Sequence, residues 1–139
     1  MSKWKALYND LTGIPDDIKP NPPATNEQIC DVEEKLKIEL PADLKELLFD
    51  MNGDDWLIFS TEQIVETNTS VRKLDFYMPL DCFLFFAGNG CGDYYGYPIT
   101  LADGVRTNKV FIWEHESDCR IWKANGLEDT IRKYYNDEI

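Results

Sequence analysis

The sequence predicts one α+β domain in which helices come first, antiparallel strands follow and a helix closes the chain. Three observations predict this order. Apolar residues recur with helical spacing up to residue 53, β-rich segments dominate between about residues 83 and 116, and helical spacing returns after Asn125. The 139 residues match the usual size of a single domain, so we expect one domain over residues 1–139.

Three helices are expected before residue 53, each with an apolar stripe and an end signal. Gly13 and Pro15 end the first, and residues 16–24, with three prolines, predict a stiff extended connection. Thr25 and Gln28 have capping-box spacing for the second, and Pro41 suits the first turn of the third. The stripes are Trp4, Leu7, Tyr8 and Leu11, then Ile29, Val32 and Leu36, then Leu44, Leu47, Leu48 and Met51.

The spacing then changes to that of strands. Residues 56–59 are expected to form a strand, and Ser60 to cap a short helix ending near Asn68. Residues 83–87 and 94–99 are expected to pair as a hairpin. In residues 109–116, Val110, Ile112 and Glu114 alternate with Phe111, Trp113 and His115, which predicts a strand with two different faces. The last helix follows Asn125, with Leu127, Ile131, Tyr134 and Tyr135 as its apolar residues.

Three glycines at alternate positions, Gly88, Gly90 and Gly92, separate the two hairpin strands. Glycine accepts positive φ, so this cluster predicts a tight turn. A dinucleotide site needs a helix directly after the glycines, and none is expected here. Asp93 follows the cluster; it either satisfies backbone N–H groups of the turn or contacts a binding partner.

The chain is strongly acidic, with a formal net charge of −12. Residues 21–70 hold 3 basic and 12 acidic side chains, a net charge of −9. Such a surface repels nucleic-acid phosphates, so we expect no direct DNA or RNA binding. It would attract a basic protein, although solubility alone is the alternative explanation.

No apolar run reaches membrane length, and no signal-peptide pattern opens the sequence, so we expect a cytoplasmic protein without membrane contact. Cys30, Cys82, Cys91 and Cys119 are widely spaced and accompany a single histidine, a pattern that indicates no zinc site. We expect buried, reduced thiols; two disulfides would be the alternative in a secreted protein.

Two chemical sites can be imagined from the sequence. Cys91 and His115 could form a nucleophile–base pair, but the sequence supplies no group to orient the histidine and no oxyanion-hole signature. The carboxylates Asp54, Asp55, Asp93 and Glu114 could gather around a calcium ion, but no loop with alternating oxygen ligands is present. We therefore expect no enzyme, no metal and no cofactor.

Three landmarks stand in order along the chain: LPADLKELL at residues 40–48 with Asn52-Gly53, GNGCGDYYG at 88–96, and VFIWEHE at 110–116. Together they resemble the SUKH superfamily of the Smi/Knr type. The resemblance covers roughly residues 26–136. It implies a strongly bent antiparallel sheet of about five or six strands with helices packed against it. It also implies a protein-binding role: many bacterial members are immunity proteins that occlude a nuclease or deaminase toxin, and fungal relatives regulate cell-wall synthesis.

We therefore expect a non-enzymatic protein-binding domain, an immunity protein against a basic toxin domain, with a regulatory or scaffold role as the alternative. Neighbours on a strand point to opposite faces, so at least one of Tyr94 and Tyr95 should face away from the core. Tyrosine and tryptophan are favoured interface residues, and carboxylates beside them suit a basic partner. The expected partner-binding residues are Asp54, Asp55, Trp56, Asp93, Tyr94, Tyr95 and Glu114.

Overall fold

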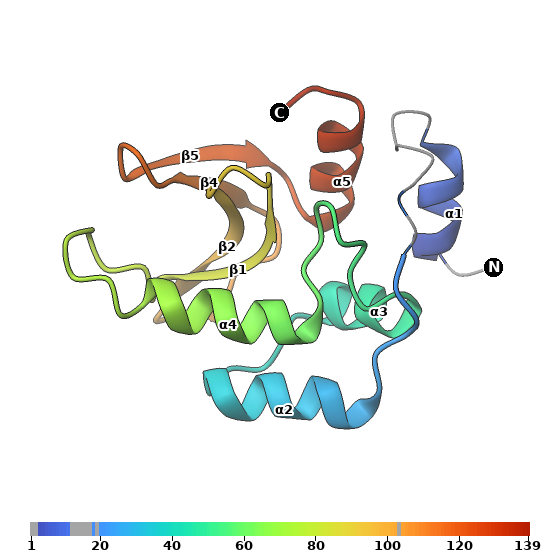
Figure 1. The fold of residues 1–139 in the computed structure, drawn as a ribbon, viewed down its shortest axis with the longest axis horizontal. Coiled ribbons are helices and arrows are strands. Elements are labelled where there is room, and N and C mark those ends of the chain that lie inside the picture. Colours follow the sequence, from blue (N-terminus) through green and yellow to red (C-terminus); the bar gives the residue numbers. More distant parts are fainter. Residues whose placement is uncertain (1–2, 12–17, 19, 103) are drawn as a thin grey trace.

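The computed structural model describes residues 3–11, 18, 20–102 and 104–139. Four helices precede an antiparallel sheet, and one helix follows it, which confirms the predicted α+β class (Figure 1). In chain order the elements are α1 (Lys3–Asp10), α2 (Asn26–Leu36), α3 (Ala42–Asp50), α4 (Thr61–Val71), β1 (Phe83–Gly88), β2 (Tyr94–Thr100), β3 (Gly104–Val105), β4 (Val110–Glu114), β5 (Cys119–Ala124) and α5 (Leu127–Tyr135).

Both predicted capping boxes are present. The hydroxyls of Thr25 and Ser60 accept hydrogen bonds from the backbone N–H three residues on. In return, the side-chain oxygens of Gln28 and Gln63 accept from the backbone N–H groups of Thr25 and Ser60. Helix α4 continues beyond Asn68 to Val71, one turn more than expected. The expected end of the first helix at Gly13 and Pro15, and part of the expected 16–24 connection, lie outside the described residues.

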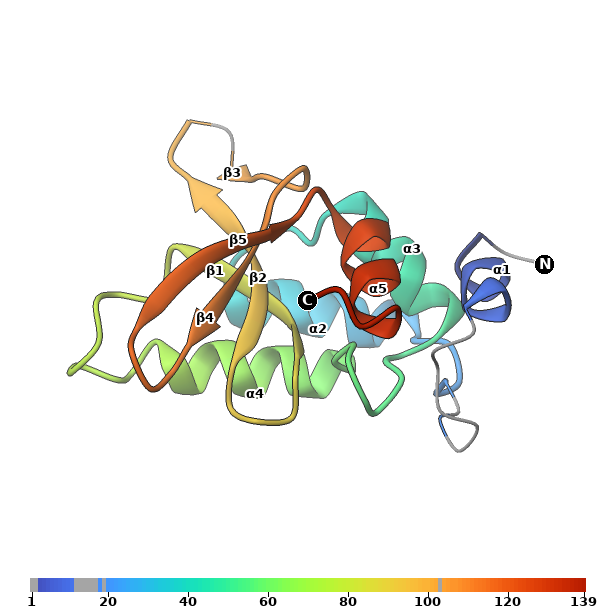
Figure 2. The same cartoon turned by 90° about the horizontal axis from the view of Figure 1, so that it is seen from above.

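The sheet has five strands in the order β1-β2-β4-β5, with β3 paired to β2, and all described pairings are antiparallel. The strands curve strongly, as Figures 1 and 2 show, and the sheet does not close. Strand β5 was not expected, because Arg120 and Lys123 interrupt its apolar pattern. It pairs with β4 through a turn in which Asp118 has a φ of 56°.

The prediction of a strand at residues 56–59 is wrong. Only an isolated bridge between Ile58 and Ala87 joins this segment to the sheet; its two backbone bonds run from Phe59 N to Phe86 O and from Gly88 N to Leu57 O. The backbone before them is curled around the Asp54 carboxylate, which accepts from the N–H groups of Trp56, Leu57 and Ile58. A strand would have aimed these N–H groups at a neighbouring strand.

Alternation along the strands builds two apolar clusters on opposite faces of the sheet. The larger one lies between the sheet and the helices and includes Tyr95 of β2 and Ile112 of β4. The smaller one includes Phe85 of β1 and Trp113 of β4, and Tyr94 and Phe111 pack against it. The predicted faces of residues 110–113 are thereby confirmed.

The four cysteines are free, but all four are exposed, so the expectation of buried thiols is wrong. None of the helices in the described ranges combines the length and the apolar composition that spanning a lipid bilayer requires.

Candidate functional site

Asp54 organises the loop between α3 and α4. Its Oδ1 accepts hydrogen bonds from the N–H groups of Trp56 at 3.0 Å, Leu57 at 2.8 Å and Ile58 at 2.8 Å. Its Oδ2 accepts from the hydroxyls of Tyr8, at 2.7 Å, and Tyr135. With 1% of its surface exposed, Asp54 cannot touch a partner in this conformation, which contradicts its predicted role. A buried carboxylate is tolerated because its charge is so fully hydrogen-bonded.

The curled loop presents the next two residues outward. Asp55 is exposed, has a φ of 58°, and accepts from Asn21 Nδ2 at 3.1 Å. The Trp56 side chain is 51% exposed, which is unusual for so large an apolar group. Both side chains are therefore accessible, and their contact with a partner stays a prediction.

Asp93 closes the glycine-rich turn between β1 and β2. Its Oδ1 lies 3.1 Å from the His115 backbone N and 2.8 Å from His115 Nδ1, and its Oδ2 accepts from Asn89 Nδ2 at 3.2 Å. Partial burial opposes its ionisation, but the bonds from His115 and Asn89 outweigh burial and lower the pKa of Asp93. The predicted role of satisfying backbone donors within the turn is wrong: the backbone N–H that donates to the Asp93 carboxylate belongs to His115, just after β4, and Asn89 Oδ1 accepts from the turn N–H groups of Cys91 and Asp93.

Asp93 is also the orienting group that the sequence did not reveal for His115. Its carboxylate holds one imidazole nitrogen, as an orienting acid does in nucleophilic enzymes. Within the described contacts, however, no cysteine or serine hydrogen-bonds the ring of His115. The described residues also contain no group of three histidine, cysteine or acidic side chains placed to hold a metal ion.

Tyr94 and Tyr95 point to opposite faces of β2, as alternation requires. Tyr95 is only 2% exposed and belongs to the larger core, where burial raises its pKa to about 12. The predicted contact of Tyr95 with a partner is therefore contradicted by its burial. Tyr94 is half-buried on the other face, edge-on to Phe59 at 5.8 Å and stacked on Trp113 at 5.9 Å between ring centroids.

A hollow of about 280 Å³ lies between the Asp54 loop and the glycine-rich turn. Gly88 forms part of its floor: a Cβ there would lie 3.1 Å from the Phe59 ring and 3.3 Å from the Tyr94 ring, so only glycine leaves these rings undisturbed. The lining residues are Asp55, Trp56, Ile58, Phe59, Gln63, Gly88, Gly90, Gly92 and Tyr94. Three predicted partner-binding residues, Asp55, Trp56 and Tyr94, thus meet at one hollow from two parts of the sequence.

Glu114 is the remaining predicted residue and lies apart from the hollow. It ends β4, pairs with Cys119 of β5 and is half-buried. The acidic residues of the 27–55 region are also divided by the fold. Glu39, for example, lines a different depression together with Gly104 and Val105 of β3.

A family model described as SUKH_6: SMI1-KNR4 cell-wall matches residues 26–130. The chain belongs to this family. The match runs from the start of α2 into the first turn of α5 and so contains the Asp54 loop, the glycine-rich turn and β4. The resemblance predicted from residues 40–48, 88–96 and 110–116 is confirmed. No curated protein sequence matches the SUKH chain.

Proposed function

We propose that this SUKH chain is a non-enzymatic protein-binding domain that acts as an immunity protein and neutralises a bacterial toxin of the nuclease or deaminase type by stoichiometric occlusion. The observation that carries the proposal is the meeting of Asp55, Trp56 and Tyr94 at one hollow of an acidic protein. Family membership supports it, because SUKH domains interact with proteins.

The hollow has the chemistry of an interface centre. Trp56, Phe59 and Tyr94 offer aromatic surface that loses water when a partner closes over it, and such residues dominate binding energies in interfaces. Asp55 offers a carboxylate beside that surface, which suits an arginine or lysine of the partner. Asp93 contributes indirectly, because its bonds to His115 and Asn89 hold the turn that forms one wall.

The overall charge of −12 supports a basic partner. Nucleases bind polyanions and therefore carry positive surfaces, so an acidic inhibitor meets them quickly and covers the surface that their substrate needs. Asp55 would act at short range, whereas the other acidic residues of the 21–70 region would act through the long-range field.

A regulatory role is the second candidate, and the family description, which names a cell-wall domain, favours it. In that case the same hollow would bind an endogenous enzyme or scaffold protein, and no toxin would be inhibited.

The test is capture of partners by the tagged chain from its source cells, elution with rising salt, and identification by mass spectrometry. A basic nuclease or deaminase that elutes as salt rises, and whose activity is abolished by an equimolar amount of the chain, supports the immunity role. Recovery of endogenous cell-wall enzymes alone would replace it by the regulatory role.

Two variants separate contact from long-range attraction. Asp55→Lys and Glu39→Lys change the net charge equally, but only Asp55 lines the hollow. We expect Asp55→Lys to weaken the captured complex at least about tenfold more than Glu39→Lys. Equal weakening of the complex by the two variants would show that the partner does not bind at the hollow.

A further inference from the structure

The loop from Arg72 to Cys82, which joins α4 to β1, displays apolar side chains outward. Phe76 is 74% exposed and Met78 is 67% exposed. Soluble proteins expose large apolar side chains singly, but two such residues at the tip of one loop are the usual composition of a binding anchor. Figures 1 and 2 show this loop projecting beyond the end of α4.

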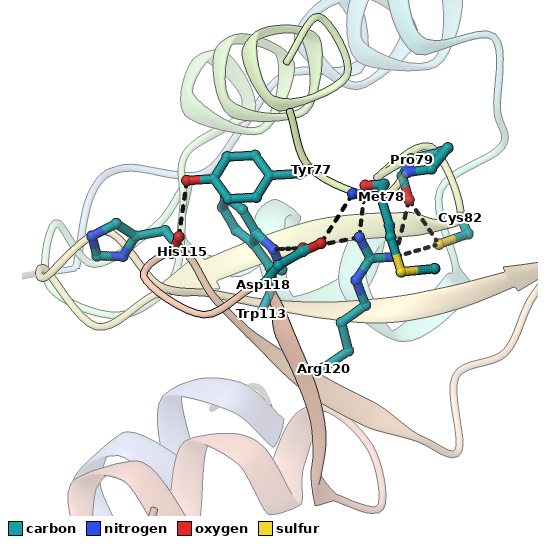
Figure 3. Close-up of polar contacts among 8 residues, drawn as sticks. All are labelled: Tyr77, Met78, Pro79, Cys82, Trp113, His115, Asp118 and Arg120. Carbon is teal, nitrogen blue, oxygen red and sulfur yellow. Dashed lines mark hydrogen bonds and ion pairs between the residues drawn. The ribbon is translucent and has the colours of Figure 1, made fainter. Parts of the chain in front are cut away.

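The loop is held by side chains of the β4–β5 hairpin (Figure 3). Asp118 Oδ2 accepts from the Met78 backbone N–H at 2.9 Å, and Arg120 donates to the carbonyl oxygens of Met78 at 2.7 Å and Pro79 at 3.0 Å. The Tyr77 hydroxyl donates to the His115 carbonyl oxygen at 2.8 Å. An ordered loop loses little conformational entropy when it binds. The network therefore holds Phe76 and Met78 in position for contact before a partner arrives.

Asp118 is the centre of this network. Its Oδ1 accepts from Trp113 Nε1 at 2.7 Å and from Arg120 at 3.1 Å, while its Oδ2 holds Met78. Partial burial opposes its ionisation, but the bonds from Met78, Trp113 and Arg120 together lower the pKa of Asp118. The carboxylate thus ties the loop to the sheet in its charged form.

A continuous row of aromatic rings joins this loop to the hollow. Phe59 contacts Tyr94 at 5.8 Å between centroids, and Tyr94 contacts Trp113 at 5.9 Å. Trp113 contacts Tyr77 at 5.0 Å, and Tyr77 contacts Phe76 at 4.6 Å. An interface of ordinary size, about 800 Å² on each partner, reaches across such a row.

The surroundings of the loop are acidic. Residues 72–82 and 113–120 contain the three basic residues Arg72, Lys73 and Arg120, against the five acidic residues Asp75, Asp81, Glu114, Glu116 and Asp118, a net charge of −2. Like charge opposes docking of a second copy of this acidic chain and favours a partner with a basic face.

We propose that Phe76 and Met78 form a second anchor for the basic protein partner that binds at the hollow, with Asp118 and Arg120 as positioning residues. The inference rests on the proposed function for the identity of the partner. It adds a second contact site on the surface of this chain, and it predicts that the partner contacts this site with an apolar patch flanked by lysine or arginine.

The probe is a synthetic amphipathic helical peptide of leucine and lysine, followed by amide NMR of the isotope-labelled chain. The expected signal changes fall on residues 74–81 and 113–118, and a leucine–glutamate peptide of the same pattern should cause none. Changes confined to other residues, no binding, or equal binding of the acidic peptide would overturn the inference.

The double variant Phe76→Ser and Met78→Ser should weaken peptide binding at least about tenfold. Leu101→Ser is the matched control, because Leu101 is a fully exposed apolar residue after the end of β2. It should leave binding unchanged; an equal loss in the control would contradict the inference.

Arg120→Gln keeps both apolar side chains, and it should speed hydrogen exchange at the Met78 amide and weaken binding by a smaller factor.

The same variants separate this inference from the proposed function. If a captured toxin binds the double serine variant as tightly as the original chain, the second anchor is wrong and the immunity role stands. If the peptide results hold but no toxin is captured, the anchor stands and the immunity role fails.

Discussion

Asp54 and Tyr135 lie 81 residues apart in the chain, yet the Tyr135 hydroxyl donates a hydrogen bond to Asp54 Oδ2. Tyr8, from the other end of the chain, donates to the same oxygen. One carboxylate therefore joins α1, the loop before α4, and α5. Both tyrosines lie outside the family match at residues 26–130, so residues beyond the matched segment hold the loop of the candidate site.

We predict that Asp54→Ala destabilises the protein by about 3–5 kcal/mol, because two buried hydroxyls and three N–H groups lose their acceptor. Urea unfolding followed by circular dichroism measures the loss. Asp55→Ala, one residue on and exposed, is the control and should cost about 1 kcal/mol or less. Similar losses in the two variants would show that Asp54 does not organise the loop.

Replacing Gly92 should cost more than replacing Gly90. Both have positive φ, 94° and 79°, so alanine strains the backbone by about 1–2 kcal/mol at either position. At Gly92 the added Cβ would also lie 2.9 Å from His115 Cε1, whereas at Gly90 it meets open space. Gly92→Ala should therefore shift the imidazole NMR signals of His115, the single histidine, and Gly90→Ala should not. An unmoved imidazole signal in Gly92→Ala would contradict the close contact.

The stability of the turn should depend on acid pH through Asp93. The pKa of Asp93 is lowered in the folded state, so its stabilising contribution is complete above the unfolded value of about 3.9 and disappears as the pH falls through the folded value. Asp93→Asn should be less stable than the original chain at neutral pH, and the difference should shrink below about pH 4. Unfolding free energies measured across this range test the prediction; a constant difference would show that ionisation of Asp93 is not involved.

The four thiols should react in the native protein, because all four cysteines are free and exposed. Titration with a chromogenic disulfide reagent should count four thiols per chain without urea. The count should fall by one in Cys119→Ser, with no change in unfolding free energy beyond about 0.5 kcal/mol. Thiols that appear only after unfolding would contradict the exposed positions.

Local signals predicted much of the fold. The stripes of the helices, the two capping boxes and the hairpin around Gly88–Gly92 are properties of neighbouring residues, and the structure contains all of them. Strand β5 was missed because Arg120 and Lys123 interrupt its apolar pattern. The Arg120 side chain donates hydrogen bonds to carbonyl oxygens of the 72–82 loop. The segment 56–59 was assigned to a strand because its composition is β-like, whereas Asp54 curls the backbone before it.

The candidate site was predictable in part. Asp55, Trp56 and Tyr94 were expected to bind a partner, and they meet at the hollow. Strand alternation predicted that at least one of Tyr94 and Tyr95 faces away from the core, but not which one, and no pattern in the sequence showed that Asp54 would be buried. The burial of Asp54 and Tyr95 depends on residues far away in the chain, namely Tyr8 and Tyr135 for Asp54 and Tyr134 for Tyr95.

By itself, the sequence determined the α+β class, the acidic charge, the glycine turn and the family, because each depends on composition or on residues close in the chain. The tertiary structure decided which carboxylates and aromatics are exposed. It turned Asp54 inward and Trp56 outward, paired Asp93 with His115, and set Phe76 and Met78 on a loop that Asp118 holds. These outcomes depend on packing between distant segments, where burial of one side chain is balanced by hydrogen bonds from another.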